Sequence, residues 1–266
     1  MRENRRDPKK VEAYFGNIRN PNKFHWSALL NYFASKGDHT RTTHWFQKMR
    51  QNNRPRPNDF CYNIRMKALN RSHLRPHEKL IRLQQVFAEM QEDEAVALDV
   101  TSYSTLMNAY VAAKDAKGAQ DVFNQMQKDE AVALDVTSYN TLMNAYVAAK
   151  DAKGAQDVFN QMQKDEAVAP NVTSYNTLMN AYVAAKDAKG AQDVFNQMQK
   201  DEAVALDVTS YSTLMNAYVA AKDAKGAQDV FNQMQKDEAV APNVTSYNTL
   251  MNAYVAAKDA KGAQDV

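Results

Sequence analysis

The residues able to do acid–base, nucleophilic or metal chemistry are gathered in the first 90 positions of this 266-residue chain. All five histidines and the only cysteine, Cys61, lie there, so the rest of the chain has no imidazole or thiolate to offer. His73 and His77 have the i, i+4 spacing of a metal-binding pair, but Pro76 interrupts the helix and no third ligand follows in register. Cys61 stands beside Tyr62 and is expected to be a small buried apolar residue. These residues predict no metal, no cofactor and no enzyme activity.

Basic side chains dominate the same region and suggest a different chemistry. Residues 1–90 contain 19 Lys or Arg against 7 Asp or Glu, whereas residues 91–266 contain 14 against 24. Because cationic groups bind phosphates and release their counterions, the basic region favours contact with a nucleic-acid backbone. The candidates are Arg50, Arg54, Arg56, Arg65, Lys67, Arg71, Arg75 and Arg82. A solvated surface or a protein-docking patch is the alternative interpretation.

A third set of candidates comes from an internal repeat. The 36 residues VTSYSTLMNAYVAAKDAKGAQDVFNQMQKDEAVALD at Val100 recur at Val136, Val172 and Val208, and begin again at Val244. The four complete copies differ only in the residue after Tyr, which is Ser or Asn, and in the last two residues, which are Leu-Asp or Pro-Asn. Ser, Asn and Asp present different hydrogen-bond donors and acceptors, so the variable positions are suited to recognition. Helix capping is the alternative role for the final Asp or Asn.

The apolar spacing in each copy predicts two helices. The residues at i, i+3, i+4 and i+7 are Tyr103, Leu106, Met107 and Tyr110 in the first helix, and Ala119, Val122, Phe123 and Met126 in the second. Asp99 and Asp115 precede these helices as suitable N-caps. Gly118 costs the second helix about 1 kcal/mol relative to alanine, which is acceptable where a neighbouring helix approaches closely. The repeated tyrosines are expected to pack in the core rather than to stack on bases.

One hairpin cannot bury its own apolar stripe, but stacked hairpins can. The sequence therefore predicts an all-α fold, an α-solenoid superhelix of tandem helix-turn-helix hairpins. Its parts are a basic N-terminal extension or half repeat at 1–22, two divergent hairpins at 23–99, four near-identical hairpins at 100–243, and a truncated fifth copy at 244–266. Because the sequence ends inside the second helix of the last copy, we expect the natural product to be longer.

Localisation signals are weak in this sequence. No apolar run approaches the roughly 18 to 20 residues of a membrane span, so we expect no membrane association. A single cysteine gives no intrachain disulfide, which favours a reducing compartment. The start, MRENRRDPKK, is Arg-rich, but Glu3, Asp7 and the lack of an apolar stretch argue against a transit or secretory peptide.

The copy VTSYNTLMNAYVAAKDAKGAQDVFNQMQKDEAVAPN resembles the pentatricopeptide repeat, whose pattern runs V-T-Y-N-T-L-I-x-A-Y, then A-x-x-L-F-x-x-M, then P-D or P-N. The Trp and Leu-Gly signature of the tetratricopeptide repeat is missing. The similarity extends from Lys23 to Val266. It implies modular recognition of single-stranded RNA, one base per repeat, with the first helices lining the concave surface.

The resemblance also implies which residues read the bases, namely the residue after Tyr and the last residue of each repeat. The family's pairings imply A for Ser27 with Asn58, U for Asn63 with Asp99, G for Ser104 with Asp135, a pyrimidine for Asn140 with Asn171, U for Asn176 with Asp207, and A for Ser212 with Asn243, while Asn248 lacks its partner. The implied target resembles 5′-A-U-G-Y-U-A-3′.

The predicted function is therefore non-catalytic, sequence-specific binding of single-stranded RNA. The family implies a role in organellar RNA metabolism, or as a ribosomal-RNA-bound component of an organellar ribosome with other ribonucleoprotein subunits as partners. A mitochondrial or plastid location follows from the resemblance alone. The alternative function is an α-solenoid scaffold for protein–protein interaction, because an acidic array suits a basic peptide.

Overall fold

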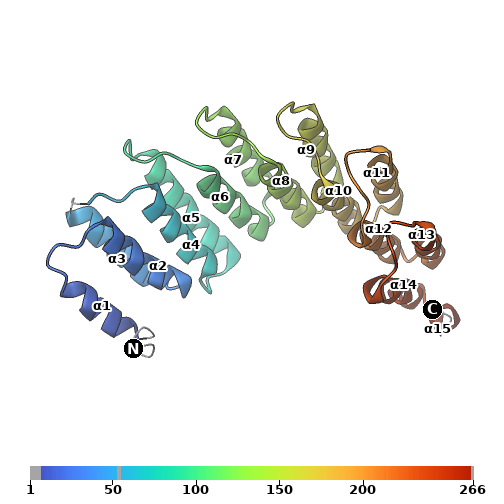
Figure 1. Cartoon of the computed structure of the whole chain (residues 1–266), viewed down its shortest axis with the longest axis horizontal. Helices are drawn as coiled ribbons and strands as arrows, with labels where there is room; N and C mark the ends of the chain where they lie inside the picture. The colour runs from blue at the N-terminus through green and yellow to red at the C-terminus, as the bar shows by residue number, and fades with distance from the viewer. Residues whose placement is uncertain (1–6, 53–54, 265–266) are drawn as a thin grey trace. The chain divides into compact units, whose positions relative to one another are not determined.

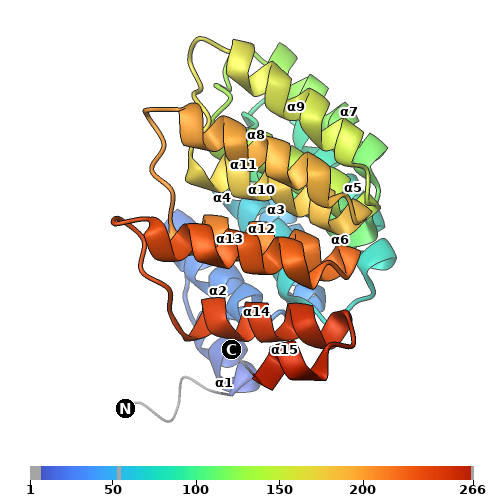
Figure 2. The same ribbon diagram turned by 90° about the vertical axis from the view of Figure 1, so that its right-hand side faces the viewer.

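The computed structural model describes residues 7–52 and 55–264 of the chain. Within these ranges there are fifteen helices and no strand, and the helices follow one another as antiparallel hairpins (Figures 1 and 2). This arrangement confirms the predicted all-α solenoid fold. None of the helices in these ranges is long and apolar enough to cross a membrane.

The chain divides into two compact units. The N-terminal unit comprises Met1–Ala113 and Asp121–Ala133, and the C-terminal unit comprises Lys114–Gln120 and Leu134–Val266. Helix α7 (Ala116–Lys128) contributes residues to both. The division therefore falls within the first of the near-identical copies, and it does not coincide with residue 100, where the sequence changes character.

The N-terminal unit begins with a single helix and continues with two complete hairpins, here called the front hairpins. Its helices are α1 (Pro8–Gly16), α2 (Lys23–Ser35) and α3 (His39–Asn52) in the first front hairpin, α4 (Asp59–Arg71) and α5 (Pro76–Gln91) in the second, and α6 (Val100–Ala113). The first helices α2, α4 and α6 pack against one another in order, and each second helix packs on its own first helix and on the next.

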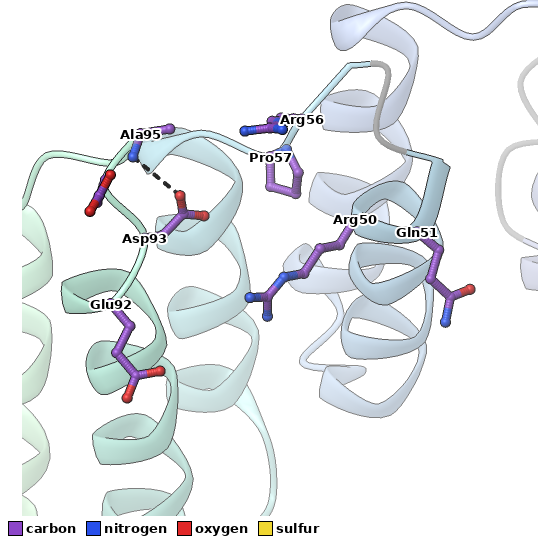
Figure 3. A pocket seen from close by; sticks show the side chains of 8 residues that line it. Arg50, Gln51, Arg56, Pro57, Glu92, Asp93 and Ala95 are labelled. Atoms are coloured by element: carbon purple, nitrogen blue, oxygen red, sulfur yellow. Dashed lines mark hydrogen bonds between the residues drawn. The ribbon is translucent and has the colours of Figure 1, made fainter.

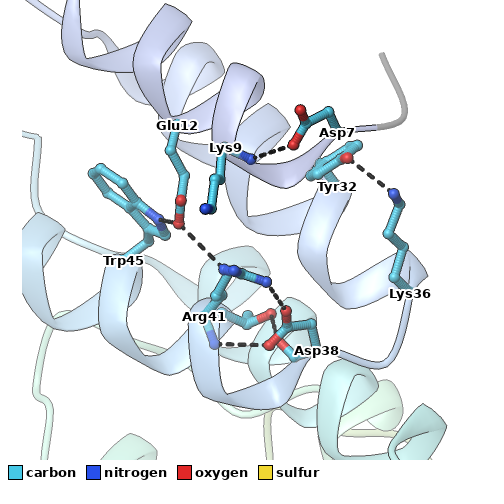
Figure 4. A network of polar contacts seen from close by, with 9 residues as sticks. Asp7, Lys9, Glu12, Tyr32, Lys36, Asp38, Arg41 and Trp45 are labelled. Carbon is cyan, nitrogen blue, oxygen red and sulfur yellow. Dashed lines mark hydrogen bonds and ion pairs between the residues drawn. The ribbon is translucent and has the colours of Figure 1, made fainter. Parts of the chain in front are cut away.

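Helix α1 is held on the first front hairpin by a mixed aromatic and polar contact (Figure 4). The ring of Phe15 lies edge-on to Trp26 at a centroid distance of 4.7 Å. Glu12 accepts a hydrogen bond of 3.0 Å from the indole N–H of Trp45 and pairs with Arg41 at 3.5 Å. The short helix thus covers the apolar start of the solenoid in this unit.

The C-terminal unit repeats one hairpin design, and its three complete hairpins are here called the array hairpins. They are α8 (Val136–Ala149) with α9 (Ala152–Lys164), α10 (Val172–Ala185) with α11 (Ala188–Lys200), and α12 (Val208–Ala221) with α13 (Ala224–Lys236), followed by α14 (Val244–Ala256) and α15 (Ala260–Gln264). The first helices α8, α10, α12 and α14 pack against one another in order, and each second helix of the array hairpins packs on its own first helix and on the next.

The core of the array hairpins consists of the residues that the helical spacing predicted. Tyr175, Leu178 and Met179 of α10 are buried, as are Val158 and Phe159 of α9. The ring of Phe159 meets that of Tyr175 edge-on at 4.9 Å, and the same contact recurs one copy later. The tyrosines that follow Ser in the four complete copies are therefore core residues, as predicted, whereas Tyr247 of the fifth copy is exposed.

The helix ends and the glycine of the second helix also behave as the sequence predicted. The carboxylate of Asp99 accepts a bond of 2.8 Å from the backbone N–H of Ser102, and that of Asp115 accepts one of 2.9 Å from Gly118. A methyl group at the equivalent Gly154 would overlap the ring of Tyr146, so the close approach requires glycine. Between the two helices Lys150 adopts a left-handed backbone with φ of 59°.

Hydrogen bonds between side chains join the helices of the array hairpins at a fixed spacing of 26 residues, and a related bond in the front spans 31. The hydroxyl of Tyr139 donates to Asp165 at 2.8 Å, and that of Tyr182 donates to the side-chain carbonyl of Gln156 at 3.0 Å. In the front, Tyr62 donates to Asp93 at 3.2 Å, and burial, followed by the charge of Asp93, raises the pKa of Tyr62 to about 12. Burial and the aspartate partner likewise raise the pKa of Tyr139.

Candidate nucleic-acid interface

The variable residue after Tyr is placed on the first helix of every hairpin, close to its N-terminus. In the array hairpins Asn140, Asn176 and Ser212 are only 9%, 8% and 7% exposed. Nevertheless, one side-chain oxygen at this position has no hydrogen-bond partner. The oxygens concerned are Oδ1 of Asn63, Asn140 and Asn176 and Oγ of Ser104 and Ser212. An unpaired buried polar group lowers the free energy of unfolding by about 1–3 kcal/mol, so five such atoms at one position of the repeat call for an explanation.

The last residue of each copy caps the first helix of the next. Oδ1 of Asp207 accepts a bond of 2.8 Å from the N–H of Ser210, and Oδ1 of Asn171 accepts one of 3.0 Å from Ser174. Asp135 and Asn243 cap α8 and α14 in the same way. The predicted capping role is therefore confirmed. Capping uses Oδ1 for both residue types, so Asp and Asn differ at the other terminal atom, which is an acceptor in Asp and a donor in Asn.

The two members of a predicted base-reading pair lie together in the front hairpins. The amide of Asn63 donates to the carboxylate of Asp99 at 3.0 Å, although the residues are 36 positions apart, and both line a cavity of about 520 Å³. Ser27 and Asn58 line a second cavity of about 590 Å³, in which Oδ1 of Asn58 is buried without a partner.

The remaining pairs are placed by their helices. Asn140 and Asn176 lie on α8 and α10. Their predicted partners Asn171 and Asp207 cap the first helices of the next hairpins, α10 and α12. Ser212 lies on α12, and Asn243 caps α14. Ser104 and Asp135 belong to different compact units. Asn248 is exposed on α14.

Two of the predicted phosphate-binding arginines are surrounded by acidic side chains. Arg50 and Arg56 line a cavity of about 800 Å³ together with Glu92, Asp93 and Glu94 (Figure 3). Arg50 also lies 3.8 Å from Glu89. Because the carboxylates repel a phosphate as strongly as the arginines attract it, this edge is a poor phosphate site.

The structure corrects the sequence-based expectation that Arg65 is exposed and contacts a phosphate. It is buried, its guanidinium donates to both carboxylate oxygens of Glu89, and it lies 5.0 Å from the ring of Phe46. The sequence showed a basic residue at this position but not its acidic partner from the next helix. Arg65 is thus a buried cation that is paired with Glu89.

The other basic candidates are more varied in their surroundings. Lys67 and Arg71 are exposed on α4 and line the same cavity as Asn63 and Asp99. Arg75 precedes α5 and is exposed, and Arg82 pairs at 2.9 Å with Glu78 on the same helix. Arg54 lies outside the described residues. Lys67 and Arg71 therefore share a cavity with a predicted base-reading pair.

Two residues that the sequence reasoning missed stand beside the front pairs. Phe24 and Phe60 line the cavity that contains Ser27 and Asn58. Alignment of the divergent hairpins with the array would have revealed them, because they occupy the place where every array copy has threonine, as in Thr137.

The structure agrees with the sequence-based interpretation of the cysteine. Cys61 is fully buried, and burial raises the pKa of its thiol, so it acts as an apolar core residue. His73 and His77 are exposed. Among the residues that the structure describes, no group of three or more His, Cys, Asp or Glu is arranged to hold a metal ion.

Tandem helical hairpins, with variable polar residues at the same place on their first helices, define a helical repeat protein. Residues 85–131, 128–185 and 193–257 match the family model of the pentatricopeptide repeat domain, and residues 173–202 also match that of the PPR repeat. Because these matches cover more than half of the chain, the chain belongs to the pentatricopeptide repeat family. No curated protein sequence matches it.

Solved structures show the same fold. The pentatricopeptide repeat protein PPR10 from maize is 20% identical with a TM-score of 0.56, over 97% of this chain and 40% of that one. PPR10 in complex with an 18-nt psaJ RNA element gives 20% identity and a TM-score of 0.60, over 97% and 41%. The PPR domain of Arabidopsis thaliana protein-only RNase P 1, in complex with tRNA, gives 17% and 0.52, over 67% and 92%. This chain thus spans about two fifths of the length of the maize protein.

Proposed function

We propose that this chain is a non-catalytic protein that binds single-stranded RNA in a sequence-specific manner, with one base read by each hairpin. The observation that carries the proposal is the row of buried side-chain oxygens without partners at the variable position after Tyr. Base edges supply the donors that such oxygens need, so a bound base would recover the free energy lost on burying them.

The identity of the varying residues supports the same function. Ser and Asn alternate at a buried position where the fold accepts either, as Ser212 and Asn176 show. Asp and Asn alternate at a cap that uses the same atom in both. A change at either position alters the pattern of donors and acceptors while the hairpin stays the same, which is the property that a modular base reader requires.

The family supports RNA as the ligand. The maize protein of similar fold was solved with an RNA element, and the Arabidopsis domain with tRNA. We extend the proposal to organellar RNA metabolism in a mitochondrion or plastid, or to ribosomal RNA and other subunits of an organellar ribosome. That extension rests on what is usual for the family.

Substitution of Asn140 by Ser tests base reading directly. Fluorescence anisotropy would compare A-U-G-C-U-A RNA with a variant that has A at the fourth position. Wild type is expected to prefer C there, and Asn140→Ser is expected to prefer A at that position alone. Asn144→Ser, an exposed change one turn further along α8, is the matched control and should leave the preference unchanged. An Asn140→Ser variant with unaltered preference at the fourth position would reject base reading by the array.

The acidic charge of the array favours a second candidate, a scaffold that binds basic peptides. The same anisotropy assay with a labelled Lys- and Arg-rich peptide distinguishes the two. Peptide binding that salt abolishes, together with equal and weak affinity for all RNAs, would support the scaffold.

A further inference from the structure

Helix α14 exposes a row of apolar side chains, here called the α14 stripe. It consists of Val244, Tyr247, Met251 and Val255, which are three or four residues apart and therefore lie along one face of the helix. Tyr247 is 41% exposed, whereas Tyr211, at the same place of α12, is 1% exposed. Helix α12 is covered by a full second helix, α13, and by the next first helix, α14. Among the described helices, α14 contacts only α12, α13 and the short α15, so its stripe stays open.

Helix α1 packs on α2 as a second helix packs on the first helix that follows it. Phe15 of α1 meets Trp26 of α2 edge-on at 4.7 Å, and Phe159 of α9 meets Tyr175 of α10 in the same way at 4.9 Å. Helix α10 contacts both helices of the hairpin before it, α8 and α9, whereas α1 is the only described helix before α2. Helix α1 is therefore a second helix without a first helix beside it in the described part of the chain.

An apolar cavity, here called the α1–α2 cavity, lies beside α1. It has a volume of about 360 Å³, and its lining includes Tyr14 of α1 and Ala28, Leu29 and Tyr32 of α2. Ala28 is exposed, whereas Thr177, at the same place of α10, is only 7% exposed. Open apolar surface of this kind is typical of interaction sites. The cavity thus lies on the face of α2 that the array covers with a preceding hairpin.

We infer that the α14 stripe of one chain docks in the α1–α2 cavity of a second copy. Helix α14 then packs on α2 of that copy as α8 packs on α10, and α1 completes the hairpin as its second helix. A second copy is the occupant because each end presents the helix that the other end lacks. The inference goes beyond the proposed function and does not rest on it, since no RNA takes part.

Helix α15 lies at the start of the place that α1 takes in this pair, so docking displaces it. Its five residues, AKGAQ, include neither the Phe nor the Met with which the array closes a hairpin, as in Phe159 and Met162. Phe15 and Ile18, in and just after α1, have the same spacing as that pair. Replacement of α15 by α1 therefore adds apolar contacts to α14.

Sedimentation velocity without RNA, over a series of protein concentrations, tests the head-to-tail pair. Wild type should exceed the mass of one chain and continue past two, because the two docking surfaces differ and each pair keeps one of each free. Met251→Glu and Ala28→Glu should each weaken association about hundredfold, since docking would bury the new charge. Val255→Glu, at a more exposed place, should weaken it about tenfold and keeps the test valid if Met251→Glu fails to fold.

Asn252→Glu is the matched control. It adds the same charge to α14 at a place that is exposed in the array as well, as Asn216 shows, so it should associate like wild type. Circular dichroism should be the same for this variant, Val255→Glu and wild type, because both substituted side chains are exposed.

Mixing the two interface variants shows which surfaces meet. An equimolar mixture of Met251→Glu and Ala28→Glu should form pairs that stop at two chains, since the first variant keeps the cavity and the second keeps the α14 stripe. A wild type with the mass of one chain at every concentration would overturn the head-to-tail pair. Association of Ala28→Glu as strong as that of wild type would overturn it as well, and would indicate that two α14 stripes meet instead.

Discussion

The front hairpins and the array hairpins reach the same fold by different means. In the array, a glycine such as Gly154 lies beneath a tyrosine ring, whereas Arg41 holds the corresponding place in the first front hairpin, with its guanidinium 5.8 Å from the ring of Phe33. The front also contains an ion pair in which Arg65 is buried and Glu89 is partly exposed. The array packs every hairpin with the same contacts, whereas each front hairpin packs with contacts of its own.

The difference teaches what each region is free to change. Every array copy has the same core and the same ties, so variation is confined to the residue after Tyr and the last two residues. The front hairpins have diverged throughout, and their exposed face has become aromatic and basic, with Phe24, Phe60, Lys67 and Arg71.

The largest loss of stability is expected from breaking the ion pair between Arg65 and Glu89 in the front. Arg65→Ala leaves Glu89 without its main partner and removes the packing against Phe46, so the free energy of unfolding should fall by about 3 kcal/mol. Urea denaturation monitored by circular dichroism measures this. Arg65→Met with Glu89→Leu should restore most of the loss. An Arg65→Ala variant as stable as wild type would show that the ion pair does not stabilise the front hairpins.

A smaller loss of stability, caused by an added group rather than by a removed one, is expected in the array. Replacement of a helical glycine by alanine normally stabilises a helix by about 1 kcal/mol. At Gly154 the added methyl group would overlap the ring of Tyr146, so Gly154→Ala should instead lower the stability by about 2 kcal/mol. Gly154→Ala combined with Tyr146→Ala relieves the overlap and should lose less than the sum of the single variants. Stabilisation by Gly154→Ala alone would contradict the close approach.

The smallest change in stability is expected at a residue that we propose reads a base. Asn140→Ala removes a buried oxygen that has no partner, so the RNA-free chain should become more stable by about 1 kcal/mol. The same variant should lose its base preference at the fourth RNA position. Asn144→Ala, at an exposed place on the same helix, gains only the higher helix propensity of alanine, so it should stabilise the chain less than Asn140→Ala and leave the base preference unchanged. A destabilised Asn140→Ala variant would mean that the amide has a structural role in α8.

The sequence predicted the array far better than the front. Identical copies repeat the same apolar spacing, so both helices, their aspartate caps, the buried tyrosines and the need for glycine follow from one copy. Arg65 was expected at the surface because its partner Glu89 lies on another helix, and charge alone does not reveal a long-range pair. Phe24 and Phe60 were missed because divergent copies hide the alignment that places them opposite Thr137. The proximity of Asn63 to Asp99 was expected from the family resemblance rather than from spacing.

The 26-residue ties also determine how this protein can vary in length. Tyr182 donates to Gln156 of the preceding copy and Tyr218 donates to Gln192 of the preceding copy, so each copy presents its neighbours with the same partners. Excision of residues 172–207 would join Asn171 to Val208 and leave α8 facing α12, whose residues match those of α10 except at the variable position. Loss or duplication of a whole copy therefore leaves every remaining contact intact and changes stability by one hairpin and its interface. Recombination between the near-identical copies would thus produce chains of different lengths that all fold.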